Sequence, residues 1–196
     1  MDLVHLLEKL SKIESSSKRE DKLASFVTNY LKNLGYNSFT EYSNVLLSPE
    51  KEFIIATHMD TFKVLSPFSF DGEYAYGTGV CDAKASIAAI LLALERIDLK
   101  RLNFGIAFFC DEEGDGSGSE IFCRVYKPKM AIIMEPTNMK IANVQYGGLE
   151  LKVKAKGVSA HGAVPKMGDN AIEKCITAAH NLLTNIKDAI ISVQYI

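Results

Sequence analysis

The sequence lacks a long apolar run, a block of basic residues and a close pair of cysteines, and each absence excludes a class of protein. The longest uncharged helical run, residues 85–94, has about half of the ~20 residues that a membrane span needs. A formal net charge of −2 without a Lys/Arg block argues against a nucleic-acid binder. We therefore expect neither a membrane nor a nucleic acid as a partner.

The cysteine pattern is typical of a protein with reduced thiols. The chain has four cysteines far apart and no C-x-x-C pair: Cys81, Cys110, Cys123 and Cys175. Charged residues, beginning with Asp2, interrupt the first apolar stretch, so we expect no secretion signal. In a chain without such a signal, reduced thiols are the default state. We therefore expect a cytoplasmic protein.

What the chain does contain is typical of a folded α/β protein. It has 196 residues, 47% of them hydrophobic and 23% charged, which is long enough to bury a core and too apolar for intrinsic disorder. Apolar residues spaced by three and four predict amphipathic helices over residues 3–13 and 23–34. Ser17–Glu20 predicts a capping box before the second helix, and Gly35 predicts its end.

Three nearly continuous apolar runs predict the strands of the sheet. Phe53–Thr57, Phe104–Cys110 and Met130–Met134 are typical of buried parallel strands. Between the first two, residues 84–97 are almost all Ala, Ile and Leu, which predicts a helix packed against the sheet. Because strands alternate with helices, we predict an α/β fold in which helices cover both faces of the sheet.

The pattern changes near residue 146, where we place a domain boundary. Leu149–Lys156 alternates apolar and polar residues, which predicts a strand with one solvated face. A helix is expected over about residues 170–186, and Ile190–Ile196 begins another strand. The sequence thus predicts an α/β domain over residues 1–146 and part of a smaller α+β module over residues 147–196.

Residues capable of chemistry are concentrated just past the three apolar runs and in the loop before the helix of residues 84–97. They are one imidazole and several carboxylates: His58, Asp60, Asp82, Asp111, Glu112, Glu113 and Glu135. The carboxyl ends of strands in open α/β sheets are where sites form, so these groups should converge in one crevice. Carboxylates that share a crevice without cations require shifted pKa values or a bound cation. Imidazole with carboxylates suits zinc or a related divalent ion.

Each segment alone has a simpler interpretation. His58 and Asp60 could form an ordinary turn, residues 111–114 a solvated loop, and Asp82 with Lys84 a surface ion pair. Their joint placement after buried strands favours a common site. A nucleotide-binding loop over residues 114–119 is excluded, because Ser119 replaces the third glycine of G-x-G-x-x-G and the surrounding carboxylates would repel phosphate.

Five segments in order carry a family resemblance: THMDT, GTGVCDAK, DEEGDGSGS, MEPT and GVSAHGAVPKMGDNAI. With them the chain resembles the acetylornithine deacetylase and succinyl-diaminopimelate desuccinylase family of co-catalytic zinc hydrolases, which includes aminoacylases and carboxypeptidases. The resemblance implies an aminopeptidase-like sheet of the zinc exopeptidase type and a lid or dimerisation domain. Ala85 departs from the glycine that is frequent in the family. Family members are roughly twice as long and have a C-terminal metal-binding histidine without a counterpart here, so the chain looks like their N-terminal half.

The resemblance also implies a metal-ligand set. Asp82 would bridge two divalent ions, most simply zinc, with cobalt or manganese as alternatives. His58 and Glu135 would complete the first site. Glu113 would bind the second ion, together with the histidine that has no counterpart.

The implied catalytic residues are three. Glu112 would be the general base, and Asp60 would orient the imidazole of His58. His161 would stabilise the oxyanion, in dimeric members often from the partner subunit. From the residues alone, His161 is more simply a histidine of a flexible loop.

These inferences predict a metal-dependent amidohydrolase that cleaves an N-acyl amino acid or a small peptide, as a homodimer through the lid. Two alternatives remain open. The chain could be a catalytically impaired fragment or a non-catalytic metal-binding relative, as the missing histidine suggests. It could also be a metal-binding or partner-binding module in which the carboxylates are structural.

Overall fold

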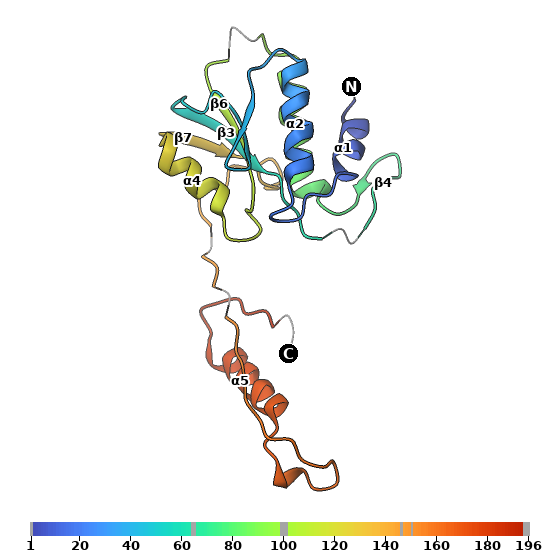
Figure 1. Ribbon diagram of the computed structural model, residues 1–196, viewed down its shortest axis with the longest axis vertical. Helices are drawn as coiled ribbons and strands as arrows, with labels where there is room; N and C mark the ends of the chain where they lie inside the picture. The colour runs from blue at the N-terminus through green and yellow to red at the C-terminus, as the bar shows by residue number, and fades with distance from the viewer. Residues whose placement is uncertain (1, 64–65, 99–101, 146, 150, 194–196) are drawn as a thin grey trace. The chain divides into compact units, whose positions relative to one another are not determined.

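The computed structural model describes residues 2–63, 66–98, 102–145, 147–149 and 151–193. The chain forms two compact units, Met1–Ala142 and Asn143–Ile196 (Figure 1). Among the described residues, no helix is both long enough and apolar enough to cross a membrane.

The first unit is built on a five-stranded sheet with the order β1-β2-β6-β3-β7. Its strands are β1 (Phe39–Glu41), β2 (Asn44–Leu47), β3 (Phe53–His58), β6 (Gly105–Phe109) and β7 (Met130–Ile133). The central β3 runs parallel to β6 and β7, whereas β2 runs antiparallel to both β6 and β1. The three strands predicted from the apolar runs are thus confirmed. The β1–β2 pair was not predicted, nor was the separate hairpin of β4 (Ser69–Phe70) and β5 (Ala75–Tyr76).

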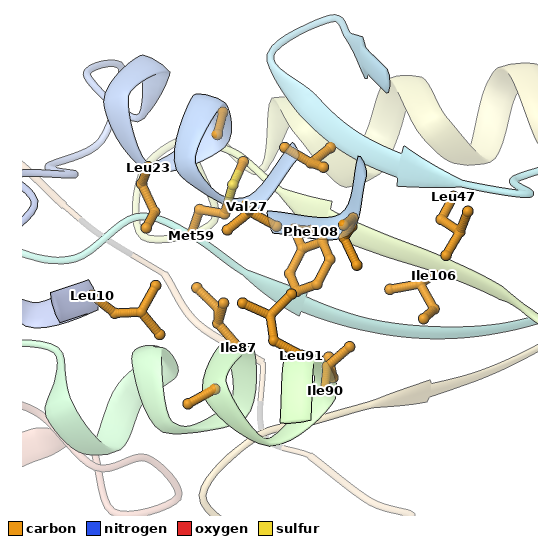
Figure 2. Packing of buried hydrophobic residues seen from close by; sticks show 14 of the residues in the cluster. Leu10, Leu23, Val27, Leu47, Met59, Ile87, Ile90, Leu91, Ile106 and Phe108 are labelled. Atoms are coloured by element: carbon orange, nitrogen blue, oxygen red, sulfur yellow. The ribbon is translucent and has the colours of Figure 1, made fainter. Parts of the chain in front are cut away.

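Helices cover both faces of this sheet, as predicted. The helices described in the first unit are α1 (Leu3–Ser11), α2 (Asp21–Asn33), α3 (Ala85–Leu94) and α4 (Ser117–Tyr126). On one face the fully buried Phe108 of β6 packs with residues of the first three helices, and Figure 2 shows its ring between side chains of α2 and α3. The next residue, Phe109, points to the other face, where its ring lies 5.3 Å from that of Phe122 on α4. This alternation along β6 is what fills both cores.

The capping box predicted at Ser17–Glu20 is wrong. Helix α2 begins at Asp21, and Glu20 makes no side-chain bond to the first turn. Both side chains instead bond to distant segments: Ser17 donates to Asp60, and Glu20 accepts from the backbone of Asp111. Tertiary partners therefore override the local pattern. Gly35 does end the helix, with a φ of 88° that favours glycine.

The predicted burial of the third apolar run is also wrong. Strand β7 forms as expected, but Met130, Ile132 and Ile133 are 65%, 54% and 52% exposed. The reason is position, because β7 is the edge strand of the sheet and pairs with β3 on one side.

In the second unit the predicted helix forms, whereas the described residues of the two predicted strands do not form strands. Helix α5 (Ala171–Asn185) begins at Asn170, whose side chain accepts the backbone N–H groups of Ile172 and Glu173. The described residues among 149–156 and 190–193 form no strand, and residues 150 and 194–196 lie outside the described part. Alternating apolar and polar residues would give a strand one solvated face, but a strand forms only when it pairs with a neighbouring strand. The boundary at residue 146 and the lid or dimerisation role stay predictions.

Candidate metal centre

The three parallel strands end side by side and place the candidate residues at one edge of the sheet. His58 is the last residue of β3 and is paired in register with Phe109 of β6. Past the strand ends the pairing continues, because Met59 N–H donates to the Phe109 carbonyl and Met134 N–H donates to the Ala56 carbonyl, both at 2.8 Å. The segments that follow β6 and β7 therefore leave the sheet next to His58.

Asp82 reaches this edge from the turn η1 (Val80–Lys84), which precedes α3. Its Oδ1 lies 2.8 Å from Nε2 of His58. Gly79 has a φ of 73°, and a Cβ there would collide with the side chain of Thr61, so glycine lets this loop approach the end of β3. The alternative of a surface ion pair between Asp82 and Lys84 is wrong. Lys84 is 1% exposed, donates to the Ile13 carbonyl at 2.7 Å, and has its pKa lowered to about 8 by burial.

The imidazole of His58 is 2% exposed and surrounded by acceptors. Its Nδ1 lies 2.9 Å from the backbone carbonyl oxygen of Asp60 and 3.4 Å from a carboxylate oxygen of the same residue. Burial opposes the charged form, but the carboxylates of Asp60 and Asp82, with those of Glu112 and Glu135, raise the pKa of His58 to about 10. The ring therefore carries a second proton at neutral pH in the metal-free protein.

Asp60 is fully buried and joins three segments. Its Oδ1 accepts the backbone N–H of Glu112, and its Oδ2 accepts the backbone N–H of Glu113, both at 2.9 Å. The hydroxyl of Ser17 donates to the same Oδ2 at 2.7 Å. Burial alone would raise the pKa of this carboxyl, but these bonds and His58 hold it below its usual range. Asp60 thus stays ionised and contacts both the imidazole of His58 and the acidic loop, residues 111–113.

Two sets of side chains bring donor atoms close enough to hold a cation. In the first set, His58, Asp82 and Glu135, one ligand atom from each residue lies within 4.8 Å of the others; the same holds for His58, Glu112 and Glu113. Burial, reinforced by the neighbouring carboxylates, raises the pKa values of Glu113 and Glu135. Like charges forced together in this way favour a bound cation, and an imidazole with carboxylates is a donor set that suits a divalent ion. The residues present therefore fit a metal.

The predicted ligands meet, whereas one predicted catalytic residue lies in the other unit. Glu112 is half-exposed, and its Oε2 lies 3.9 Å from Nε2 of His58, so the expected base stands beside the expected ligands. His161 is an exposed residue of the second unit, where its Nδ1 accepts the backbone N–H of Ala163 at 3.2 Å. Its role in stabilising an oxyanion stays a prediction.

Two residues near the site were not foreseen as part of it, Ser17 and Glu20. Glu20 is 3% exposed, and its Oε1 accepts the backbone N–H groups of Asp111 and Lys18 at 2.9 and 3.0 Å. Because the 17–20 segment matches a capping pattern, its sequence gave no reason to connect it with residues 60 or 111. The role of Glu20 becomes visible only in the structure, where its partner Asp111 is seen.

Comparison with known proteins identifies a family. The family model "Peptidase family M20/M25/M40" matches residues 54–193, which contain every candidate ligand. The chain is 29% identical over 208 residues to a probable carboxypeptidase of Paracoccidioides brasiliensis, covering 89% of this chain and 47% of that protein. It is 26% identical over 191 residues to the LysW-lysine/LysW-ornithine hydrolase of Saccharolobus solfataricus, covering 96% of this chain and 51% of that protein.

The fold is shared with a solved tripeptidase. A tripeptidase from Staphylococcus aureus superposes with a TM-score of 0.58 at 17% identity, covering 91% of this chain and 55% of that one. The predicted aminopeptidase-like fold is confirmed by this likeness. The chain spans about half the length of the curated relatives that it matches. With the ordered motifs, the sheet and the family match over residues 54–193 in agreement, this chain belongs to peptidase family M20/M25/M40.

Proposed function

We propose that this chain is the metal-binding, water-activating part of a hydrolase that cleaves the amide bond of a small peptide or an N-acyl amino acid. The observation that carries the proposal is the group formed by His58, Asp82 and Glu135, with Glu112 next to the same imidazole. Membership of a peptidase family and likeness to proteins named carboxypeptidase and hydrolase support it.

Five side chains receive metal-binding or proton-transfer roles in this proposal. His58, Asp82 and Glu135 would hold one divalent ion, most simply zinc, and Glu113 would hold a second ion together with Asp82. A divalent ion at this place supplies Lewis-acid chemistry, which polarises a carbonyl and makes water more acidic. Glu112, held on a loop and given no ligand role, removes a proton from the attacking water.

The proton balance of the reaction then follows. Water adds to the amide carbon, and its proton passes to the carboxylate of Glu112. The C–N bond breaks as Glu112 returns that proton to the leaving nitrogen, which gives a carboxylic acid and an amine. The acid then passes its remaining hydroxyl proton to the amine, so the products at neutral pH are a carboxylate and an ammonium. Asp60 keeps the backbone of Glu112 fixed during both transfers, because its Oδ1 accepts that residue's N–H. We propose that His161 stabilises the oxyanion of the reaction. We also propose that a homodimer through the second unit brings His161 to the site.

The test combines metal content with hydrolysis of a panel of dipeptides, tripeptides and N-acetyl amino acids. Glu112→Gln should keep the metal and lower kcat by at least ~100-fold. Asp82→Asn should lose metal, because it removes a ligand shared by both ions. Glu120→Gln is the matched control, since that side chain is 61% exposed on α4 and pairs with Arg124.

The outcomes separate the alternatives. Loss of metal from the Glu112 variant and retention by the Asp82 variant would overturn the assignment of base and bridge. A chain that holds metal yet hydrolyses none of the panel would favour the non-catalytic metal-binding alternative.

A further inference from the structure

Three consecutive backbone N–H groups of the acidic loop, at Asp111, Glu112 and Glu113, each donate to a buried carboxylate. The first donates to Glu20 at 2.9 Å, and the next two donate to the two oxygens of Asp60, also at 2.9 Å. Each N–H belongs to the peptide plane that precedes its residue. Both planes that flank Glu112 are therefore anchored, and so are both planes that flank Asp111. Fixed planes fix the direction in which each side chain leaves the backbone.

The segment that joins α1 to α2 supplies much of this anchoring. Glu20 contributes one of the two carboxylates, and Ser17 donates its hydroxyl to the other, that of Asp60, at 2.7 Å. The same segment is tied to the chain past β3, because Thr61 N–H donates to the Ser15 carbonyl at 2.9 Å. On the solvent side, Lys18 pairs with Asp115 at 2.7 Å. Residues 15–20 thus contact two of the four sequence segments from which candidate ligands come, the segment after β3 and the acidic loop.

Capping of α2 does not explain the burial of Glu20. Acidic side chains are almost never this buried unless they are paired, and this one makes no bond to the first turn of α2. Its bonds run to the N–H of Asp111 and to the N–H of Lys18. Because these two donors lie in different segments, Glu20 links the acidic loop to the segment between α1 and α2.

We infer that Glu20 and Ser17 are positioning residues that hold Glu112 and Glu113 in place toward His58. This inference deepens the proposed function and rests on it. Removing the Glu20 acceptor leaves the buried N–H of Asp111 without a partner, and the loop must shift to satisfy it. Such a shift changes where Glu113 and Glu112 stand relative to the imidazole. Removing the Ser17 hydroxyl loosens Asp60, which anchors the same loop.

The experiment uses the full chain and Co²⁺ alone as the probe, because its visible absorption reports on the geometry of its ligands. Glu20→Ala should weaken Co²⁺ binding by at least ~10-fold, as the loss of a group that orients metal ligands does, and should alter the visible spectrum. Glu20→Gln keeps an acceptor oxygen at the same place and should stay close to the unchanged chain. Glu14→Gln is the matched control, since that glutamate lies in the same segment with 52% of its side chain exposed.

A purely structural role for Glu20 would lower the thermal midpoint of the metal-free chain and leave the Co²⁺ affinity and spectrum of the folded variant unchanged. That outcome would overturn the inference, and so would a Gln variant that is as weak as the Ala variant. If Glu20→Ala does not fold, Ser17→Ala decides, because it removes a hydroxyl from a half-buried residue outside the helices. Unchanged Co²⁺ binding in that variant would also overturn the inference.

Failure of the proposed function gives a different result. A starting chain that binds no Co²⁺ would overturn the metal centre and this inference together. If the unchanged chain binds Co²⁺, and its folded Glu20→Ala and Ser17→Ala variants bind it equally well, only the positioning role is overturned.

Discussion

Nε2 of His58 lies 2.8 Å from Oδ1 of Asp82, and both residues belong to one group of candidate metal ligands. Without a metal, the proton on Nε2 occupies the space between an imidazole and a carboxylate. The pKa of His58, raised to about 10, keeps that proton in place at neutral pH. A metal ion and this proton therefore compete for the same ring nitrogen.

This competition predicts a pH dependence of metal binding. The ring is protonated below its folded pKa of about 10, and a metal ligand must be deprotonated, so each bound ion should release the proton of His58. The Co²⁺ affinity of the chain should then rise by about tenfold for each pH unit from 6 to 8, since one proton is displaced. Calorimetric titration in two buffers of different ionisation enthalpy counts the protons. An affinity that stays constant between pH 6 and 8 would contradict the prediction.

The core gives a second prediction, which does not depend on the metal. Phe108 is fully buried between helices and sheet, whereas Phe62 is 66% exposed. Phe108→Ala should lower the free energy of unfolding by about 3–5 kcal/mol, because it removes a buried ring and leaves a cavity. Phe62→Ala should change it by no more than about 0.5 kcal/mol. Denaturant unfolding of the metal-free chain measures the change in unfolding free energy for both variants. Equal decreases would contradict the described burial of Phe108.

Much of the sheet was predictable, because burial on both faces leaves a plain signal. Strands β3 and β6 are nearly all apolar, and their ends directly precede the candidate ligands. Helix α4 (Ser117–Tyr126) was missed because its first residues, Ser-Gly-Ser, continue a glycine-rich segment that is typical of a loop. Its apolar spacing, Phe122 to Tyr126, becomes informative only once Phe109 is known to lie opposite.

The site was predictable to the extent that its residues follow apolar strands or, for Asp82, precede an apolar helix, and the family resemblance implied their roles. His58, Asp82, Glu112, Glu113 and Glu135 were all named from their places in the chain. Ser17 and Glu20 were not, since their partners lie 43 and 91 residues away and no local pattern records such contacts. Hydrogen bonds to backbone N–H groups depend on the path of the chain rather than on the partner's side chain. They therefore leave no trace in a motif.

The cysteines give a third prediction. Cys110 is buried, and burial, with the nearby carboxylates of Glu20 and Asp111, raises the pKa of its thiol to about 11. Cys81 and Cys123 are exposed. Because the thiolate is the reactive form, a disulfide reagent at pH 8 should label the two exposed cysteines of the folded chain and reach Cys110 only after unfolding. Mass spectrometry of the labelled peptides identifies each site. Labelling of Cys110 at the rate of Cys81 would contradict the described packing.

The last prediction concerns removal of the metal. An ion that binds the folded chain and not the unfolded one stabilises it by about 2.7 kcal/mol when its free concentration is 100 times the dissociation constant. The effect should be marked here, because the ion also relieves the crowding of carboxylates that raises the pKa values of Glu113 and Glu135. Dialysis against a chelator should therefore lower the thermal midpoint, and added Zn²⁺ should restore it. Asp82→Asn should abolish the response to Zn²⁺, whereas Glu120→Gln, remote on α4, should preserve it. An Asp82 variant that responds to Zn²⁺ as the unchanged chain does would place the stabilising ion elsewhere, since a site without its shared carboxylate cannot keep its affinity.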